Sequence, residues 1–157
     1  MNLLELAKFL VKAKKKTYAG EGEEISPQRP RFKELEYKEG DWYYRDSYSG
    51  FYQAPGQEVV YFQDEPVWAM AYSGGMRKEF YENKALAEKT FNFLKECLSR
   101  VEEKEPFRGP RKYSEGDFSY EMELEGDIND FSGEERIYHQ GKEVFHQYFI
   151  GGTIIQK

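Results

Sequence analysis

Apolar residues recur at helical spacing in two segments of the chain. The first segment follows Asn2, a residue type favoured at the N-cap of a helix, and its apolar positions are Leu3, Leu6, Ala7, Leu10, Val11 and Ala13. The second has one stripe formed by Leu86, Thr90, Phe93, Leu94, Cys97, Leu98 and Val101, with charged and polar residues opposite it. Both patterns predict a helix that lies on a hydrophobic core.

Runs of apolar and aromatic residues after each predicted helix indicate antiparallel strands. We place them near residues 42–48, 57–62 and 66–73 after the first helix, and near 118–124, 134–139, 143–150 and 153–156 after the second. A short extra strand is expected before each Glu-Gly-Asp turn. The pair Gln140-Gly141 lies between two apolar runs and predicts a two-residue hairpin loop.

The two halves of the chain share a series of residues in the same order. Tyr37, Glu39, Gly40, Asp41, Tyr44 and Gly50 recur as Tyr113, Glu115, Gly116, Asp117, Tyr120 and Gly126, and Gly56, Glu58, Tyr61, Val67, Gly74 and Gly75 recur as Gly133, Glu135, Tyr138, Val144, Gly151 and Gly152. Shared turn glycines imply a shared strand layout. The predicted fold is α+β, with two tandem pseudo-repeats, each one helix followed by three to four antiparallel strands. We expect them to pack as a single domain over 1–157, with repeat one at 1–76 and repeat two at 82–154.

Composition and charge narrow the class of protein. The chain has 157 residues, 39% of them hydrophobic, and a net charge of −6. Without a long basic stripe it is a poor candidate for direct nucleic acid binding. The apolar start is interrupted by Glu5 and Lys8, which argues against a signal peptide. With no apolar run of roughly 20 residues, we expect a cytoplasmic protein without a membrane anchor. A homodimer is compatible with these features.

Motifs for several common chemistries are missing from the sequence. It has no phosphate loop, no Rossmann glycine fingerprint, no HExxH zinc motif and no GxSxG nucleophile elbow. Cys97 is the only cysteine, and His139 and His146 are the only histidines, so we expect no metal site and no cofactor.

Hairpin register points to two inward-facing carboxylates. A two-residue loop at Gln140-Gly141 would place Glu135 opposite His146, and the matching loop in the first half would place Glu58 opposite Ala69. Each glutamate then shares a face with small aliphatic residues. A carboxylate at a core needs hydrogen-bond donors, so either backbone N–H groups and tyrosine hydroxyls satisfy both acids structurally, or the acids belong to a ligand pocket.

The candidate ligand-binding site combines these acids with aromatic and basic residues. We expect it in the wall of a cleft between the two repeats, formed by Glu58, Glu135, Tyr44, Tyr120, Trp68, His146 and Arg108. Three functions remain open. The first is a non-enzymatic small-molecule binding or sensing module. The second is a small enzyme that uses Glu58, Glu135 and His146 as acid and base groups. The third is a protein-interaction module that uses an aromatic sheet face.

The motif string of the chain is similar to that of a known family. It includes the stretches LEYKEGDWYYRDSYSG, QEVVYFQDEPVWAMAY, FRGPRKYSEGDFSY and FSGEERIYHQGKEVFHQYFIGG. The chain resembles a family of uncharacterised bacterial and archaeal proteins catalogued as a domain of unknown function. The resemblance implies a domain that occurs alone or behind a helix-turn-helix in transcription regulators, and it implies no activity.

Overall fold

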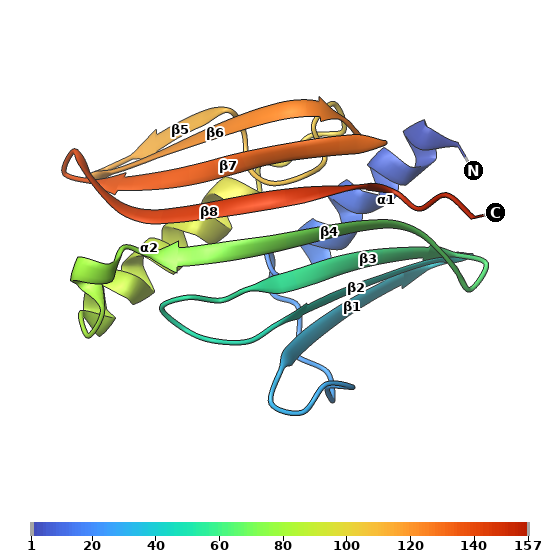
Figure 1. Ribbon diagram of the computed structural model, residues 1–157, viewed down its shortest axis with the longest axis horizontal. Coiled ribbons are helices and arrows are strands. Elements are labelled where there is room, and N and C mark those ends of the chain that lie inside the picture. Colours follow the sequence, from blue (N-terminus) through green and yellow to red (C-terminus); the bar gives the residue numbers. More distant parts are fainter. Residues whose placement is uncertain (1, 157) are drawn as a thin grey trace.

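The strands form a single eight-stranded antiparallel sheet, in the order β1-β2-β3-β4-β8-β7-β6-β5 (Figure 1). A computed structural model describes residues 2–156. The elements are α1 (Leu3–Lys16), β1 (Lys33–Glu39), β2 (Trp42–Tyr48), β3 (Gly56–Phe62), β4 (Glu65–Met76), the short 3₁₀ helix η1 (Lys78–Phe80), α2 (Lys84–Leu98), β5 (Lys112–Glu115), β6 (Phe118–Asp127), β7 (Asp130–His139) and β8 (Lys142–Thr153).

The fold class expected from the sequence, two helix-and-strand repeats packed against each other, is wrong. The fold is dominated by its sheet, which continues without interruption because β4 pairs with β8 from Trp68 opposite Thr153 to Met76 opposite Phe145. Turn glycines and apolar spacing predict local strands, but they do not predict which strand edges meet. The expected separate strand at 153–156 is also absent, since Thr153 ends β8.

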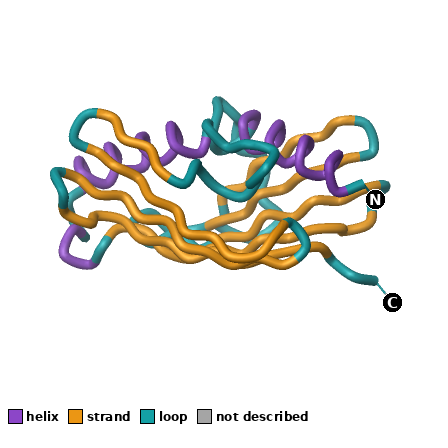
Figure 2. Tube along the Cα trace, turned by 90° about the horizontal axis from the view of Figure 1, so that it is seen from above, coloured by secondary structure: helices purple, strands orange, loops and turns teal. Residues whose placement is uncertain are grey.

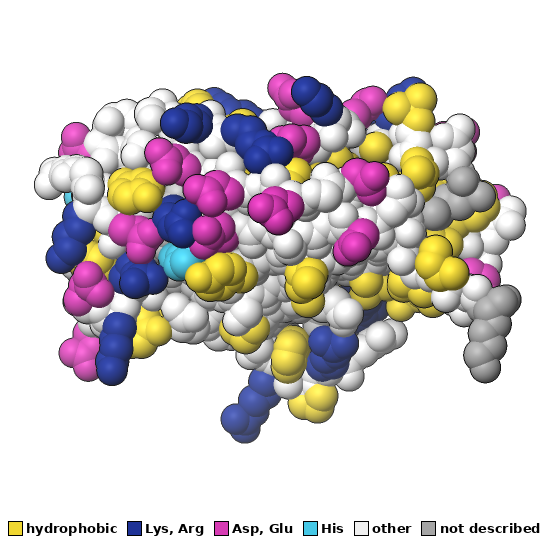
Figure 3. Space-filling model, turned by 45° about the horizontal axis from the view of Figure 1, so that its top comes forward, with side chains coloured by type: hydrophobic (Ala, Val, Ile, Leu, Met, Phe, Trp, Pro, Cys, Tyr) yellow, Lys and Arg dark blue, Asp and Glu magenta, His cyan; other side chains and the backbone are white. Residues whose placement is uncertain are grey.

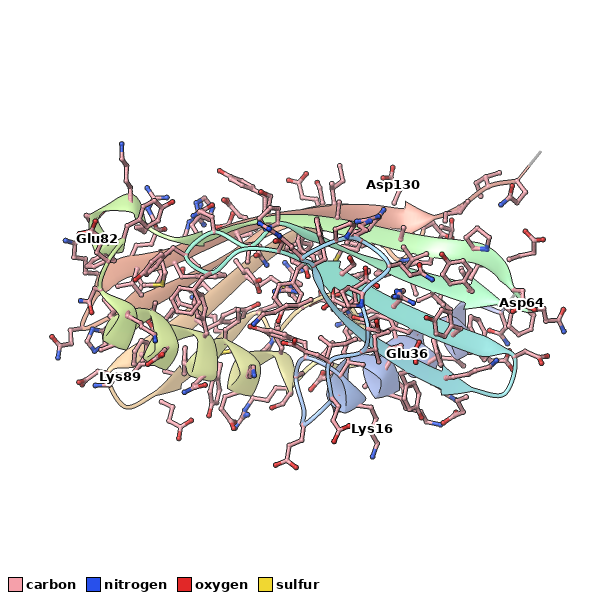
Figure 4. All side chains as sticks on the ribbon, turned by 90° about the horizontal axis from the view of Figure 1, so that it is seen from below. Lys16, Glu36, Asp64, Glu82, Lys89 and Asp130 are labelled. Atoms are coloured by element: carbon pink, nitrogen blue, oxygen red, sulfur yellow. The ribbon has the colours of Figure 1, made fainter. Side chains whose placement is uncertain are left out.

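Both helices cover the same face of the sheet. Figure 2 shows the sheet curved, with α1 and α2 end to end along its concave side and loop segments between them. The labelled Lys16 and Lys89 lie on the side of the helices away from the sheet (Figure 4). The core therefore lies between the helices and the concave face, where Leu6, Leu10 and Leu94 meet buried aromatic residues of the strands.

The predicted N-cap at Asn2 and the predicted hairpin are confirmed in detail. Asn2 caps α1 by accepting a hydrogen bond from Leu4 N at 2.9 Å, as its side chain favours at this position. Gln140 and Gly141 form the two-residue loop between β7 and β8, with φ of 51° and 79°. Two positive φ angles match the twist of a tight hairpin. Cys97 is fully buried on the apolar side of α2, as its position in the helical stripe predicts.

Two bulges change the strand register expected from the sequence. The pairing shifts by one residue between Val60 and Tyr61 and again between Ile137 and Tyr138. Glu58 is therefore opposite Met70 instead of Ala69, and Glu135 is opposite Gln147 instead of His146. Because the extra residue lies in the partner strand each time, both glutamates keep the inward orientation that the pattern predicted.

We expect Gly74→Ala to destabilise the protein severely. Gly74 has φ of 152°, and a Cβ there would lie 2.2 Å from the backbone oxygen of His146 across the β4–β8 seam. Neither strand can move without breaking the pairing that joins the sheet. Urea unfolding should show a loss of at least about 3 kcal/mol, at the upper end of single-substitution effects.

The matched control is Gly40→Ala. Gly40 has φ of 59°, and a methyl group at this position would project into open space, so only backbone strain applies, about 1 kcal/mol. Equal losses for the two variants would contradict the proposed closeness of the strands at Gly74.

Candidate functional site

Glu135 on β7 is a buried carboxylate with a complete set of donors. It is 0% exposed. Its Oε1 accepts hydrogen bonds from Arg108 Nε at 2.9 Å, Arg108 Nη2 at 2.6 Å and Gln147 Nε2 at 2.9 Å. Its Oε2 accepts from Tyr120 Oη at 2.6 Å, and Gly109 N in turn donates to Tyr120 Oη at 3.1 Å. The carboxylate has no need of a ligand, so its arrangement fits a structural role.

Glu58 on β3 is paired less tightly than Glu135. Its Oε2 accepts a hydrogen bond from Lys14 Nζ in the last turn of α1, and its Oε1 lies 3.7 Å from Arg108 Nη1. Burial lowers the pKa of Lys14, while the charge of Glu58 opposes that change. For Arg108 burial also acts to lower the pKa, but the two carboxylates outweigh it and raise the pKa above its usual value. Arg108 thus links two carboxylates that come from opposite halves of the sheet.

Asp46 on β2 lies beside Glu58 and has no basic partner among the described residues. It is 3% exposed, and its Oδ1 accepts a hydrogen bond from Tyr72 Oη at 2.7 Å. Burial, followed by the charge of Glu58, raises the pKa of Asp46 to about 7. Ionisation of Asp46 therefore leaves a carboxylate without a compensating cation inside the protein.

A partly enclosed cavity of about 60 Å³ lies against Asp46 and Glu58. Its inner wall includes the buried residues Tyr44, Asp46 and Glu58, and half-buried residues such as Tyr18 and Ala54 line its outer part. By volume it could hold about five water molecules, or a molecule with about as many non-hydrogen atoms. The cavity is roofed by α1, α2 and the loops that follow them, and the sheet forms its floor.

Five of the residues predicted for the site gather in this region. Tyr44, Glu58 and Arg108 line the cavity itself. Glu135 and Tyr120 lie behind Arg108 in the hydrogen-bonded network. The cavity is not a cleft between two packed units, because its floor is one continuous sheet.

Trp68 belongs to the neighbouring core and does not line the cavity. Its ring stacks on Phe131 with centroids 5.7 Å apart, and its Nε1 donates to Ile128 O at 3.2 Å. Lys14 Nζ lies 5.9 Å from the Trp68 ring. Trp68 therefore packs beside the Lys14 end of the charged network.

His146 lies on the open face of the sheet, away from the cavity. There it contacts Glu134, with His146 Nε2 2.6 Å from Glu134 Oε2, and Arg77 Nη1 lies 3.3 Å from its Nδ1. Figure 3 shows acidic and basic side chains interspersed on this part of the surface, with a histidine among them. The bulge in β8 is the physical reason, because one extra residue moves His146 to the opposite face from the one assumed. The trio of Glu58, Glu135 and His146 is not assembled.

The sequence analysis missed several residues of the cavity and its network. They are Lys14, Tyr18, Asp46, Tyr48, Tyr72 and Gln147. The alternation along β2 could have identified Asp46, since it shares a face with Tyr44, which was among the predicted site residues. Lys14 gave no such signal, because basic residues at the end of a helix normally face solvent.

No helix among residues 2–156 is long and apolar enough to cross a bilayer. Within the same residues, no group of three or more His, Cys, Asp and Glu side chains has the arrangement that a metal ion would need.

Fold and site together define a sheet-dominated domain with a buried ion-pair network next to a small aromatic-walled cavity. The chain belongs to the family described as "Domain of unknown function (DUF5680)", whose model matches residues 46–154. Neither a curated protein nor a solved structure matches the chain. The matched segment starts at Asp46 and includes Glu58, Arg108 and Glu135.

We expect Arg108→Met to cost about 3–5 kcal/mol, because two buried glutamates would lose a shared cation. Chemical denaturation should measure the loss. The control is Arg111→Met, which breaks a partly exposed pair with Glu105 and should cost no more than about 1 kcal/mol. An Arg108 variant as stable as its control would contradict the structural importance of the network.

Asp46 should make stability depend on pH between about 4 and 7. An unfolded aspartate titrates near 4, whereas the pKa of Asp46 in the folded protein is about 7. The folded state therefore binds the extra proton in that window, so Asp46 makes the free energy of unfolding fall as pH rises and level off above about 7. Asp46→Asn should remove this slope and raise stability at pH 8 by roughly 2–4 kcal/mol.

This effect is measured by denaturation of both proteins from pH 5 to pH 8. The difference between wild type and Asp46→Asn reports on Asp46 together with its interaction with Glu58, because groups far from Asp46 titrate equally in both proteins. A difference that does not change with pH would contradict the assignment of a raised pKa.

Proposed function

We propose that the protein is a non-enzymatic module that binds or senses a small molecule in the cavity beside Asp46. The observation that carries the proposal is the unused hydrogen-bonding capacity at this cavity. Among residues 2–156, no hydrogen bond occupies Tyr44 Oη or Asp46 Oδ2, although both side chains are at least nine-tenths buried. Buried polar groups normally find partners, so such groups around a space suit a ligand.

The rest of the network supports a rigid binding site. Glu135, Arg108 and Glu58 are held by side chains from several strands and from α1, so the wall next to the cavity is fixed before anything binds. A preorganised site loses less conformational entropy on binding. Aromatic walls with few polar groups are typical of small-molecule pockets.

The enzyme alternative finds less support in the side-chain arrangement. Acid–base catalysis requires groups within reach of one substrate, and His146 lies on the other face of the sheet from Glu58. Both carboxylate oxygens of Glu135 already accept hydrogen bonds, from Arg108 and from Tyr120. The protein-interaction alternative depends on the open face, where Tyr148 and Ile150 are each 61% exposed. Association through this face, including a homodimer, is a second candidate function.

The resemblance to the family of uncharacterised bacterial and archaeal proteins implies two settings for such a module. A cytoplasmic sensing module would act either alone or attached to a DNA-binding domain, with ligand occupancy as the signal and no direct contact to nucleic acid. We propose both settings for the family as a whole in bacteria and archaea.

Filling the outer part of the cavity should abolish binding. Native mass spectrometry of freshly purified protein should detect a small adduct on the wild type, which Ala54→Phe should lack, because Ala54 lines the half-buried end of the cavity. The control is Ala71→Phe, an exposed position of β4 in a different depression, on the open face of the sheet.

Where no adduct survives purification, thermal-shift measurements with a panel of small amines, alcohols, carboxylates and sugars replace it. Binding should raise the melting temperature of the wild type and of Ala71→Phe but not that of Ala54→Phe. An absence of adducts and shifts in the wild type, or equal binding to both variants, would contradict a ligand at this cavity.

A further inference from the structure

The charges around the cavity do not balance when Asp46 is ionised. Lys14 and Arg108 are the basic groups that line it, and they are engaged by Glu58 and Glu135. Among the described residues, no lysine or arginine nitrogen forms an ion pair with Asp46. Two cations thus face three carboxylates. A buried carboxylate without a counter-charge is costly, so the site carries one uncompensated negative charge when Asp46 is ionised.

Tyrosines surround this unpaired carboxylate. Tyr72 donates to Asp46 Oδ1, and Tyr44 and Tyr48 flank Asp46 on the same face of β2. Tyr18 packs edge-on against Tyr48 with ring centroids 6.0 Å apart. Aromatic faces attract cations, most strongly where water is excluded. The rings and the carboxylate together favour the same sign of charge.

We propose that the cavity binds a small organic cation, a primary ammonium compound whose nitrogen donates to Asp46 Oδ2 between the tyrosine rings. This inference rests on the proposed small-molecule function and specifies its ligand class. A monocation completes the balance of charge beside Asp46, whereas an anion would face an unpaired carboxylate and a neutral molecule would leave it unpaired. The volume of about 60 Å³ limits the bound part to a short chain.

Cation binding should be coupled to the ionisation of Asp46. The charged or titratable groups facing Asp46 are Glu58 on β3, Lys14 on α1, Arg108 before β5, Tyr72 on β4, and Tyr44, Tyr48 and Tyr18. Of these, Glu58 opposes ionisation, and Lys14, Arg108 and the Tyr72 hydroxyl favour it without fully offsetting burial. A pKa of about 7 for Asp46 makes affinity for a cation fall by about tenfold between pH 8 and pH 6.

The test compares three probes of similar length: n-butylammonium, 1-butanol and butyrate. Ligand-observed NMR titrations with the full chain at pH 8 give each affinity. We expect n-butylammonium to bind at least tenfold more tightly than 1-butanol and butyrate to bind least. Asp46→Asn should lose the preference for the ammonium over the alcohol, and Ala54→Phe should lose binding of both. The wild type should show the tenfold decrease for the ammonium from pH 8 to pH 6, and an unchanged affinity for the alcohol.

The outcomes separate this inference from the proposed function. If 1-butanol or butyrate binds the wild type as tightly as n-butylammonium and Ala54→Phe abolishes that binding, the cavity is a ligand site but the cation assignment is wrong. If none of the probes binds, or if Ala54→Phe binds them as the wild type does, the cation assignment fails, and the co-purification measurement on the same variants decides the proposed function. Where Asp46→Asn does not fold, the pH dependence in the wild type decides, and an affinity for the ammonium that is constant from pH 6 to pH 8 overturns the inference.

Discussion

Pairing of buried charges is the constraint on which the interior of this protein depends. Arg108 enters the core from the connection between α2 and β5 and holds Glu135 directly and Glu58 at longer range. Lys14 completes the pairing of Glu58 from the last turn of α1. A charge removed from water needs such partners to offset its lost hydration. The positions of α1, the α2–β5 connection and four strands (β3, β6, β7 and β8) are therefore coupled through one network.

The sheet explains why this network can form at all. Since β4 and β8 pair, β3 and β7 lie on either side of the central pair, and their inward glutamates reach the same cation. If the two halves packed as separate units, Glu58 and Glu135 would reach the same cation only across the interface between those units. The similarity in residue order between the two halves is compatible with this arrangement.

The sequence predicted local features well because local chemistry determines them. Alternation placed β2 correctly at 42–48, the Gln140-Gly141 pair determined a hairpin, and the inward direction of Glu58 and Glu135 followed from period-two spacing. Features that depend on distant parts of the chain were missed. A bulge opposite Ile137 reversed the face of His146, and the burial of Lys14 depends on the position of Glu58, which is 44 residues away in the chain.

The match to the family begins at Asp46, which lies within β2. The boundary of the match therefore falls inside a strand and not between two elements of the fold. Residues before it supply α1, β1, Tyr18 and Tyr44, which are part of the roof, one edge strand and part of the wall of the cavity. A protein truncated there would retain the acidic floor and expose it to solvent, with most of β3 as an unprotected sheet edge open to pairing with other chains. The matched segment thus contains the sheet floor and the part of the roof that α2 supplies, but not the part that α1 supplies. Because Lys14 and Tyr18 lie outside the matched segment, a change in the helix and loop that carry them would alter the entrance of the cavity and leave its acidic floor in place.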